Sequence, residues 1–266
     1  MVPRPDVPMP LGEHLDELRR RLLWPLVAWA AVFIIAFAFQ DQLKRLFVWP
    51  LQRAIAIAGP EVAARAGILV PPEDPHRLLK TFSLGESMGV AVSLAMWAAF
   101  AVVIPLLAWQ LYAFAAVGLT ARERRLAFIL VPLAIILFYA GGIFGYFFGM
   151  PYIYAWFIDW TAQDPVASFD LRLQAYWHDF LLYTLVFGVL FDIPWAMLVL
   201  ARLGFVGAAG FARWRKPAFM LATIVAALIG PGDPFIMLVL MIPTYGLYEI
   251  GILVTRLFGQ REVRDA

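Results

Sequence analysis

Long apolar runs dominate this sequence and decide what kind of fold it can adopt. A helix needs about 20 mainly apolar residues to cross the roughly 30 Å hydrocarbon core of a bilayer. Runs near that length occupy residues 22–39, 88–111, 126–148, 180–200, 217–229 and 235–253. Charged residues make up 15% of the chain, against about 25% in a soluble domain. The sequence therefore predicts an all-α polytopic membrane protein with six transmembrane helices, forming a single integral membrane domain over residues 1–266.

The distribution of lysine and arginine predicts how these helices are oriented. Fourteen of the 21 Lys and Arg residues lie before the first run, after the last, or in the links before the third and fifth runs. Positive charge of this kind marks cytoplasmic loops. We therefore expect both termini in the cytoplasm, and in a bacterium the plasma (inner) membrane as the location. Residues 1–21 then form a cytoplasmic segment, and residues 40–87 a long external one.

The last two runs predict short helices. Residues 217–229 would make about 20 Å of helix, roughly 10 Å less than the hydrocarbon core, and the turn GPGDP follows at residues 230–234. A helix that ends inside a bilayer leaves backbone groups without partners, so the bilayer thins there or the end lies in a watery concavity. We expect an indented surface beside the fifth helix.

A charged segment, EHLDELRRR at residues 13–21, stands directly before the first run. Its leucines recur at helical spacing, which predicts an amphipathic helix. Glu17 lies three and four residues before Arg20 and Arg21, and such a pair is worth about 0.2–0.5 kcal/mol on an isolated helix. The segment fits a self-paired helix at the membrane surface, which spacing favours, or a site that binds another molecule.

A second acidic residue, Glu123, stands in the arginine-rich stretch 122–125 before the third run. Together with Thr120 it spells a capping box, in which each side chain accepts a hydrogen bond from the other residue's backbone amide. Glu123 and Glu17 could also form an acidic site, because each carboxylate can accept a bidentate hydrogen bond from a guanidinium. Spacing does not choose between these interpretations, and both can hold.

Four stretches resemble, in order and at matching spacing, the TatC family, the multispanning component of the twin-arginine protein translocase. They are EHLDELRRRLL at 13–23, QLYAFAAVGLTARERRL at 110–126, FDIPWAMLVL at 191–200 and GPGDPFIMLVLMIPTYGLYEIGI at 230–252. The resemblance covers nearly the whole chain. It implies a receptor and core scaffold, not an enzyme, that binds the twin-arginine signal peptides of folded precursor proteins at the cytoplasmic face.

The resemblance also implies how such a protein works. Export would be driven by the proton-motive force without a cofactor, and the sequence has no phosphate-binding GxxxxGK[ST] loop. Partners would be membrane lipid and single-span proteins of the TatA and TatB type, which would dock at the short fifth helix in an oligomeric complex. No nucleic acid is expected. Cysteine is absent and the three histidines lie far apart, so we expect no metal site.

Residue roles follow from the same resemblance. In signal-peptide binding, Glu17 and Glu123 would face the two arginines of the peptide. Arg19 would lie beside the first carboxylate, and Phe114 and Arg125 beside the second.

Four further positions match the family. Pro50 and Asp233 match residues of the external turns, and Asp192 and Glu249 match acidic positions inside the fourth and last spans. A carboxylate well inside a span costs roughly 2.5–3.5 kcal/mol to insert and normally faces protein interior or a water cavity. We therefore expect Asp192 to face a membrane-buried hollow, although a buried, neutral packing group is the simpler interpretation. Glu249 lies nearer the interface, where its side chain can snorkel.

The chain departs from the family at three prolines. Leu84, Val117 and Gly232 occupy positions where the family has proline. The carboxylates of the motifs remain, but the rigidity that proline gives to these turns is lost.

Two other functions share some of these features. A solute transporter or channel would need polar side chains converging along one pathway, and only Asp192 is clearly inside the membrane. An intramembrane aspartyl protease would pair Asp192 with Asp233 of the GPGD sequence. Asp192, however, lies about 12 residues, or roughly 18 Å, from the external end of its helix, so the two carboxylates are not expected to meet.

Overall fold

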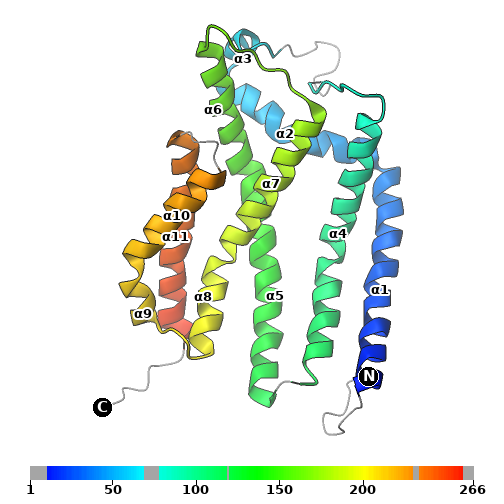
Figure 1. Ribbon diagram of the computed structural model, residues 1–266, viewed down its shortest axis with the longest axis vertical. Coiled ribbons are helices and arrows are strands. Elements are labelled where there is room, and N and C mark those ends of the chain that lie inside the picture. Colours follow the sequence, from blue (N-terminus) through cyan, green and yellow to red (C-terminus); the bar gives the residue numbers. More distant parts are fainter. Residues whose placement is uncertain (1–10, 69–77, 119, 230–233, 260–266) are drawn as a thin grey trace. The chain divides into compact units, whose positions relative to one another are not determined.

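The computed structural model describes residues 11–68, 78–118, 120–229 and 234–259 (Figure 1). Helices make up nearly all the regular structure of these residues, and the isolated β-bridge within them pairs Lys80 with Arg172. The chain forms two compact units. The first unit combines Met1–Phe47 with Thr81–Ile135, and the second combines Val48–Lys80 with Ile136–Ala266.

The first unit is built on a pair of long helices. α1 (Leu11–Ala38) packs along α4 (Glu86–Ala115), and the two run side by side in Figure 1. The indole Nε1 of Trp29 donates a hydrogen bond of 3.3 Å to the carbonyl of Met96 across this pair. Most of the large apolar side chains of α1 are exposed, as expected for a helix that contacts lipid.

The third predicted span is much longer than its apolar run. α5 (Ala121–Phe144) continues through a π-helical segment, η1 (Gly145–Gly149), into α6 (Met150–Gln163). The 43 residues from Ala121 to Gln163 form about 65 Å of helix, twice the thickness of the hydrocarbon core. The π segment precedes Pro151, which has no amide hydrogen for the usual helical bond.

Three glycines of this helix face one residue of α7 (Leu173–Phe191). Gly141, Gly145 and Gly149 all face Phe187, whose side chain is 0% exposed. A Cβ on Gly145 would lie 2.7 Å from Cδ2 of that ring, closer than real Cβ contacts. Small residues at four-residue spacing thus let α7 approach α5 and η1 closely.

The fourth predicted span is broken in its interior. α7 ends at Phe191, Asp192 stands at the break, and α8 (Ile193–Arg202) begins immediately afterwards with Pro194 in its first turn. A proline is tolerated there because the first amides of a helix have no intrahelical acceptor.

The remaining helices pack on the last one. α9 (Ala208–Arg213) leads to α10 (Arg215–Ile229), and α8, α9 and α10 all contact α11 (Pro234–Phe258). At 15 residues α10 spans about 22 Å, which agrees with the short fifth helix predicted. The prediction that the sixth helix is short is wrong, because α11 has 25 residues, or about 37 Å. The apolar run ends at residue 253, whereas the helix continues through Arg256 to Phe258.

Five helical stretches of the described residues have the length and apolar character of a membrane span, and α10 is too short to join them. They are Arg19–Ala38, Glu86–Ala115, Ala121–Gln163, Leu173–Arg202 and Pro234–Phe258. With α10 they correspond to the six runs of the sequence, so the all-α, multi-pass architecture is as predicted. That the chain functions as one domain stays a prediction.

The long segment at residues 40–87 is partly helical. It contains α2 (Gln40–Ala58) and α3 (Pro60–Arg65), and α3 lies against α6. Gly59, with φ of 96°, makes the turn between α2 and α3, a backbone conformation that other residues rarely adopt. In the second unit, Trp49 of α2 stacks on Tyr146 of η1 with ring centroids 5.2 Å apart.

Candidate functional site

The carboxylate of Glu17 is engaged within its own helix. Oε1 accepts a hydrogen bond of 2.9 Å from Nε of Arg21 and a second one from Nη2 of the same guanidinium. The predicted ion pair of Glu17 with Arg21 is thereby confirmed. Arg19 and Arg20 are exposed beside it. Since both bonds use one oxygen, Oε2 retains its capacity to accept hydrogen bonds.

Glu123 forms the predicted capping box. Its Oε2 accepts hydrogen bonds from the backbone amide of Thr120 at 2.9 Å and from Oγ1 of Thr120 at 2.8 Å. The amide of Glu123 donates to Oγ1 of Thr120 at 3.4 Å in return. The structural interpretation of this carboxylate is therefore correct. The functional one is compatible with it, because the capping bonds use Oε2 and leave Oε1 at an exposed surface.

The corner between α4 and α5 is held by aromatic residues. The hydroxyl of Tyr112 donates to the carbonyl of Arg124 at 3.1 Å, which joins the end of α4 to the first turn of α5. Trp109 and Tyr112 both contact the ring of Phe128, with centroids 6.0 and 6.1 Å away. This corner carries three of the predicted binding residues, Phe114, Glu123 and Arg125.

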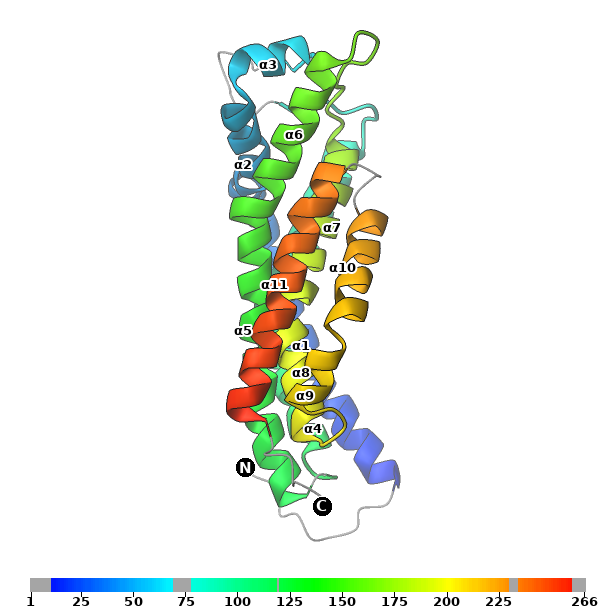
Figure 2. The ribbon, with the colours of Figure 1, turned by 90° about the vertical axis from the view of Figure 1, so that its left-hand side faces the viewer.

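The two predicted carboxylates lie at one end of the first unit. Glu17 stands in the opening turns of α1, and Glu123 in the opening turn of α5. Both views show the start of α1 at the same end of the unit as the α4–α5 corner (Figures 1 and 2). All five predicted binding residues therefore share one end, and they come from the ends of three helices.

Asp192 lies at the break between α7 and α8. Its amide bonds to the carbonyl of Val189 at 3.1 Å, and its own carbonyl accepts from Ala196 at 2.9 Å. The side-chain Oδ1 is buried and has no hydrogen-bond partner among the described residues. Burying a carboxylate oxygen without a hydrogen-bond partner costs free energy of folding. A group kept in the chain at that cost is expected to serve more than packing.

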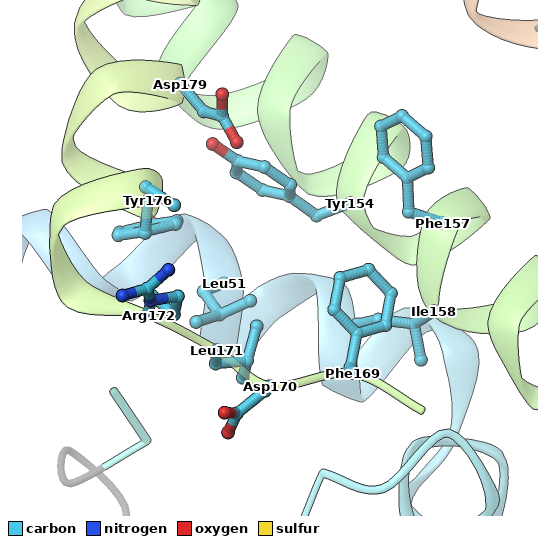
Figure 3. A pocket seen from close by; sticks show the side chains of 11 residues that line it. Leu51, Tyr154, Phe157, Ile158, Phe169, Asp170, Leu171, Arg172, Tyr176 and Asp179 are labelled. Atoms are coloured by element: carbon cyan, nitrogen blue, oxygen red, sulfur yellow. The ribbon is translucent and has the colours of Figure 1, made fainter. Parts of the chain in front are cut away.

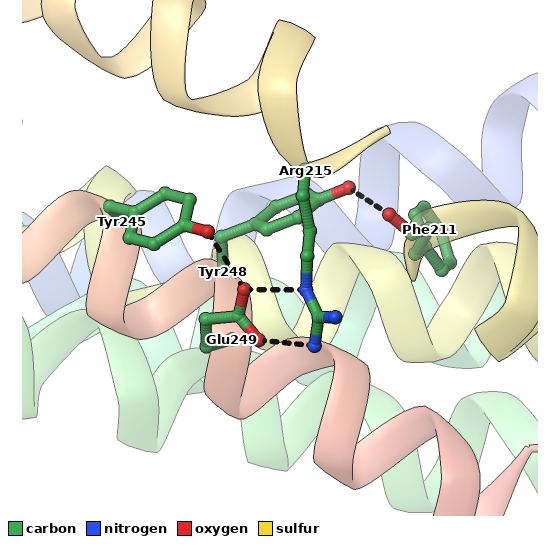
Figure 4. A network of polar contacts seen from close by, with 5 residues as sticks. All are labelled: Phe211, Arg215, Tyr245, Tyr248 and Glu249. Carbon is green, nitrogen blue, oxygen red and sulfur yellow. Dashed lines mark hydrogen bonds and ion pairs between the residues drawn. The ribbon is translucent and has the colours of Figure 1, made fainter. Parts of the chain in front are cut away.

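Glu249 is held in a polar network instead of snorkelling alone. Nε of Arg215 donates a hydrogen bond of 2.8 Å to Oε1 of Glu249, and Nη2 of Arg215 donates one of 2.8 Å to Oε2 (Figure 4). The hydroxyl of Tyr245 also donates to Oε1, at 2.9 Å. Tyr248 bonds the carbonyl of Phe211 at 2.8 Å beside them. The pair ties the start of α10 to α11. Sequence analysis missed Arg215, because it lies 34 residues from Glu249 and no local pattern connects them.

The predicted turn residues have mixed outcomes. Pro50 is buried inside α2, so it belongs to a helix and not to a turn. Asp233 and Gly232 lie outside the described residues. At Leu84, the neighbouring Glu86 carboxylate accepts hydrogen bonds from the amides of Phe82 at 2.7 Å and Ser83 at 3.3 Å. These bonds hold the turn that contains Leu84.

Comparison with known proteins identifies the family. The model of the family "Sec-independent protein translocase protein (TatC)" matches residues 13–243. The chain is 32% identical over 250 residues to the Sec-independent protein translocase protein TatC of Deinococcus radiodurans, covering 94% of this chain and 86% of that protein. It is 30% identical over 248 residues to TatCy of Bacillus subtilis, covering 93% and 89% of the two chains.

Solved structures agree with the sequence relatives. The fold matches a crystal structure of the twin-arginine translocase receptor TatC with a TM-score of 0.65 and 26% identity, over 92% of this chain and 98% of that one. A second structure of that receptor, in DDM, matches with a TM-score of 0.67 over 91% and 99%. The match of the family model over most of the sequence, together with these relatives, shows that the chain belongs to the TatC family.

Proposed function

We propose that this protein is the receptor and core scaffold of a twin-arginine translocase in a bacterial inner membrane. It binds the signal peptides of folded precursor proteins at its cytoplasmic face, with both termini in the cytoplasm, and export draws on the proton-motive force. The family takes its name from protein translocation, which fits neither a solute transporter nor an aspartyl protease. The observation that carries the proposal is the presence of Glu17 and Glu123 at one end of the first unit, each with a carboxylate oxygen outside its local bonds.

The two carboxylates are prepared for arginine in different ways. Glu123 can accept a peptide guanidinium through Oε1 while Oε2 keeps the cap of α5, so binding does not cost the helix its start. Glu17 already holds the guanidinium of Arg21, which supports the proposal that this carboxylate can bind such a group. A peptide arginine would add to that pair or replace it.

Arginine is preferred over lysine for a geometric reason. A guanidinium presents its N–H donors as a planar fork that matches a carboxylate, whereas an ammonium is a compact point charge. Phe114, at the end of α4, would supply an aromatic face on which a guanidinium can stack. Arg19 and Arg125 would orient the carboxylates or contact polar groups of the peptide.

Partner binding belongs to the second unit in this proposal. Single-span proteins of the TatA and TatB type would dock along short α10, and Asp192 would face the membrane-buried hollow in which peptide or partner helices lie. The unpartnered Oδ1 of Asp192 supports this, since a polar group of an incoming helix would complete its hydrogen bonding.

Peptide binding to the purified protein tests the proposal. A signal peptide with consecutive arginines and its twin-lysine counterpart are titrated against the parent, Glu17→Gln and Glu123→Gln. Glutamine also supports a capping box, so Glu123→Gln keeps the start of α5. Asp16→Asn is the matched control, because it neutralises an exposed carboxylate next to Glu17.

We expect the parent to bind the arginine peptide about tenfold more tightly than the lysine peptide, a difference typical of one charge-assisted hydrogen bond. Each glutamate variant should lose this preference, and Asp16→Asn should keep it. Equal binding of the two peptides by the parent, or an unchanged preference in both glutamate variants, would remove the proposed mechanism.

A further inference from the structure

A cavity of about 240 Å³ lies in the second unit, between α2, α6, the start of α7 and the segment before it (Figure 3). Most of its wall is apolar, with Leu51, Phe157, Ile158 and Phe169 among the lining residues. Pockets for whole small molecules usually measure about 300–1,000 Å³. A cavity of this size suits a headgroup or a side chain better than a complete ligand.

The cavity contains a buried polar group with no partner. The side chain of Tyr154 is only 8% exposed, and its hydroxyl makes no hydrogen bond with any described residue. Figure 3 shows the carboxylate of Asp179 turned toward this hydroxyl. Since native proteins pair nearly all buried polar groups, an unpaired hydroxyl beside a carboxylate indicates that a further group completes the site.

The cavity presents both signs of charge. Asp179 contributes a carboxylate, and Arg172 a guanidinium whose five N–H donors can serve more than one acceptor. Asp170, which also lines the cavity, forms an ion pair of 2.8 Å with Lys80. Backbone hydrogen bonds of 2.8 and 2.9 Å between Lys80 and residues 171 and 173 hold this wall in place. A carboxylate and a guanidinium on apolar walls complement a zwitterion, with a cation at one end and an anion at the other.

The place of the cavity indicates where such a zwitterion comes from. α7 starts at Leu173 and is a membrane span, so Asp179 lies about 9 Å along it from the end that the proposed topology puts outside. The 30 residues from Leu173 to Arg202 make about 45 Å of helix, the thickness of a bilayer with its headgroups, so a residue about 9 Å from the end of this span is expected near the headgroup region. Lipid headgroups are the zwitterions present there at the highest concentration.

We propose that this cavity binds the phosphoethanolamine headgroup of a phospholipid from the external leaflet. The ammonium donates to Asp179 and the Tyr154 hydroxyl, the phosphate meets Arg172, and the acyl chains leave along the apolar wall. An ammonium has three N–H donors, whereas the quaternary nitrogen of phosphocholine has none, so the site distinguishes the two. The inference does not depend on the proposed signal-peptide site, which lies in the other unit.

Short-chain lipids provide the test. Dihexanoyl phosphatidylethanolamine, phosphatidylcholine and phosphatidylglycerol are titrated against the detergent-purified protein, and bound lipid is counted by native mass spectrometry. The variants are Asp179→Asn, Tyr154→Phe and Arg172→Gln. The control is Asp164→Asn, a carboxylate in the same loop region that lies outside the cavity and accepts hydrogen bonds from the amides of Val166 and Ala167.

We expect the parent and Asp164→Asn to prefer the ethanolamine lipid over the choline lipid by about tenfold, as for one charge-assisted hydrogen bond. Asp179→Asn should abolish the preference and Tyr154→Phe should reduce it, while Arg172→Gln should weaken all three lipids. The preference for twin-arginine peptides should not change in any of these variants.

Three results would overturn the inference. The parent could bind the ethanolamine and choline lipids equally, or the preference could survive Asp179→Asn. In a separate arm, N-acetyl-lysine amide could bind in an Asp179-dependent manner while the ethanolamine lipid shows no preference. The cavity would then recognise the ammonium of a polypeptide, and the assignment to lipid would be wrong.

Discussion

Gly141→Ala and Gly142→Ala add the same methyl group to adjacent residues of α5, and we expect opposite effects on stability. A Cβ on Gly141 would lie under 3.0 Å from the backbone carbonyl oxygen of Phe187, a contact that no side-chain rotation relieves. A Cβ on Gly142 would meet Cγ2 of Thr184 at 3.6 Å, an ordinary contact.

The expected magnitudes follow from these contacts. In a helix interior, alanine is favoured over glycine by about 0.8–1.0 kcal/mol, and this gain applies to both variants. Overpacking a well-filled interface costs about 1–3 kcal/mol, and the cost falls only on Gly141→Ala. We therefore expect Gly142→Ala to match or exceed the parent, and Gly141→Ala to lose up to about 2 kcal/mol in free energy of unfolding.

A third glycine separates side-chain from backbone clashes. The three atoms nearest to a Cβ on Gly149 all belong to the ring of Phe187, so Phe187→Leu should restore part of the stability of Gly149→Ala. The same second substitution should not rescue Gly141→Ala, whose clash is with backbone. Denaturant titration in mixed micelles gives the free energies of unfolding of the parent and of these five variants. If Gly141→Ala proves as stable as Gly142→Ala, the close approach of α7 to α5 is not the real packing.

Three further predictions concern the polar groups. Arg215→Glu should weaken the contact of α10 with α11 and speed hydrogen exchange in the first turns of α10. Adding Glu249→Arg should reverse part of this effect, because the two charges are then exchanged. No recovery in the double variant would contradict the ion pair. Asp192→Asn changes the side chain whose buried Oδ1 has no hydrogen-bond partner among the described residues, so the thermal unfolding midpoint should stay equal or rise while export activity falls. A lower midpoint with full export would show that the carboxylate serves packing alone. Glu86→Ala should increase the rate of hydrogen exchange at the amides of Phe82 and Ser83 about tenfold or more, the factor that corresponds to a lost hydrogen bond of about 1.4 kcal/mol. Unchanged protection of both amides would show that the carboxylate does not hold this turn.

Local patterns predicted the features that are made locally. The apolar runs located the spans, because burial in lipid requires about 20 apolar residues wherever a helix crosses. The pair of Glu17 with Arg21 and the box of Thr120 with Glu123 follow from spacings of four and three residues. In each case both partners lie on one helix or at its start, so the sequence contains the whole interaction.

Features that join distant segments were not predictable in the same way. The apolar pattern marks where the membrane ends and not where the helix ends. The helix of α5 therefore continues through η1 and α6 to Gln163, beyond the end of the apolar run at residue 148. Arg215 and Glu249 come together only because α10 packs on α11, so the sequence alone did not predict this pair. The close contact at Phe187 did leave a signal, the glycines at 141, 145 and 149, whose four-residue spacing is typical of tightly packed membrane helices.

The lengths of α5–α6 and α10 give the protein unequal sensitivity to bilayer thickness. A helix of 43 residues is longer than the hydrocarbon core whether the core becomes a few ångströms thinner or thicker. Its ends therefore stay outside the hydrocarbon in either case. α10 has only 15 residues and begins with charged Arg215, so each ångström of thickening draws its charged start further into the hydrocarbon. Lipids with longer acyl chains would therefore strain this protein first at α10, whereas α5–α6 would be little affected.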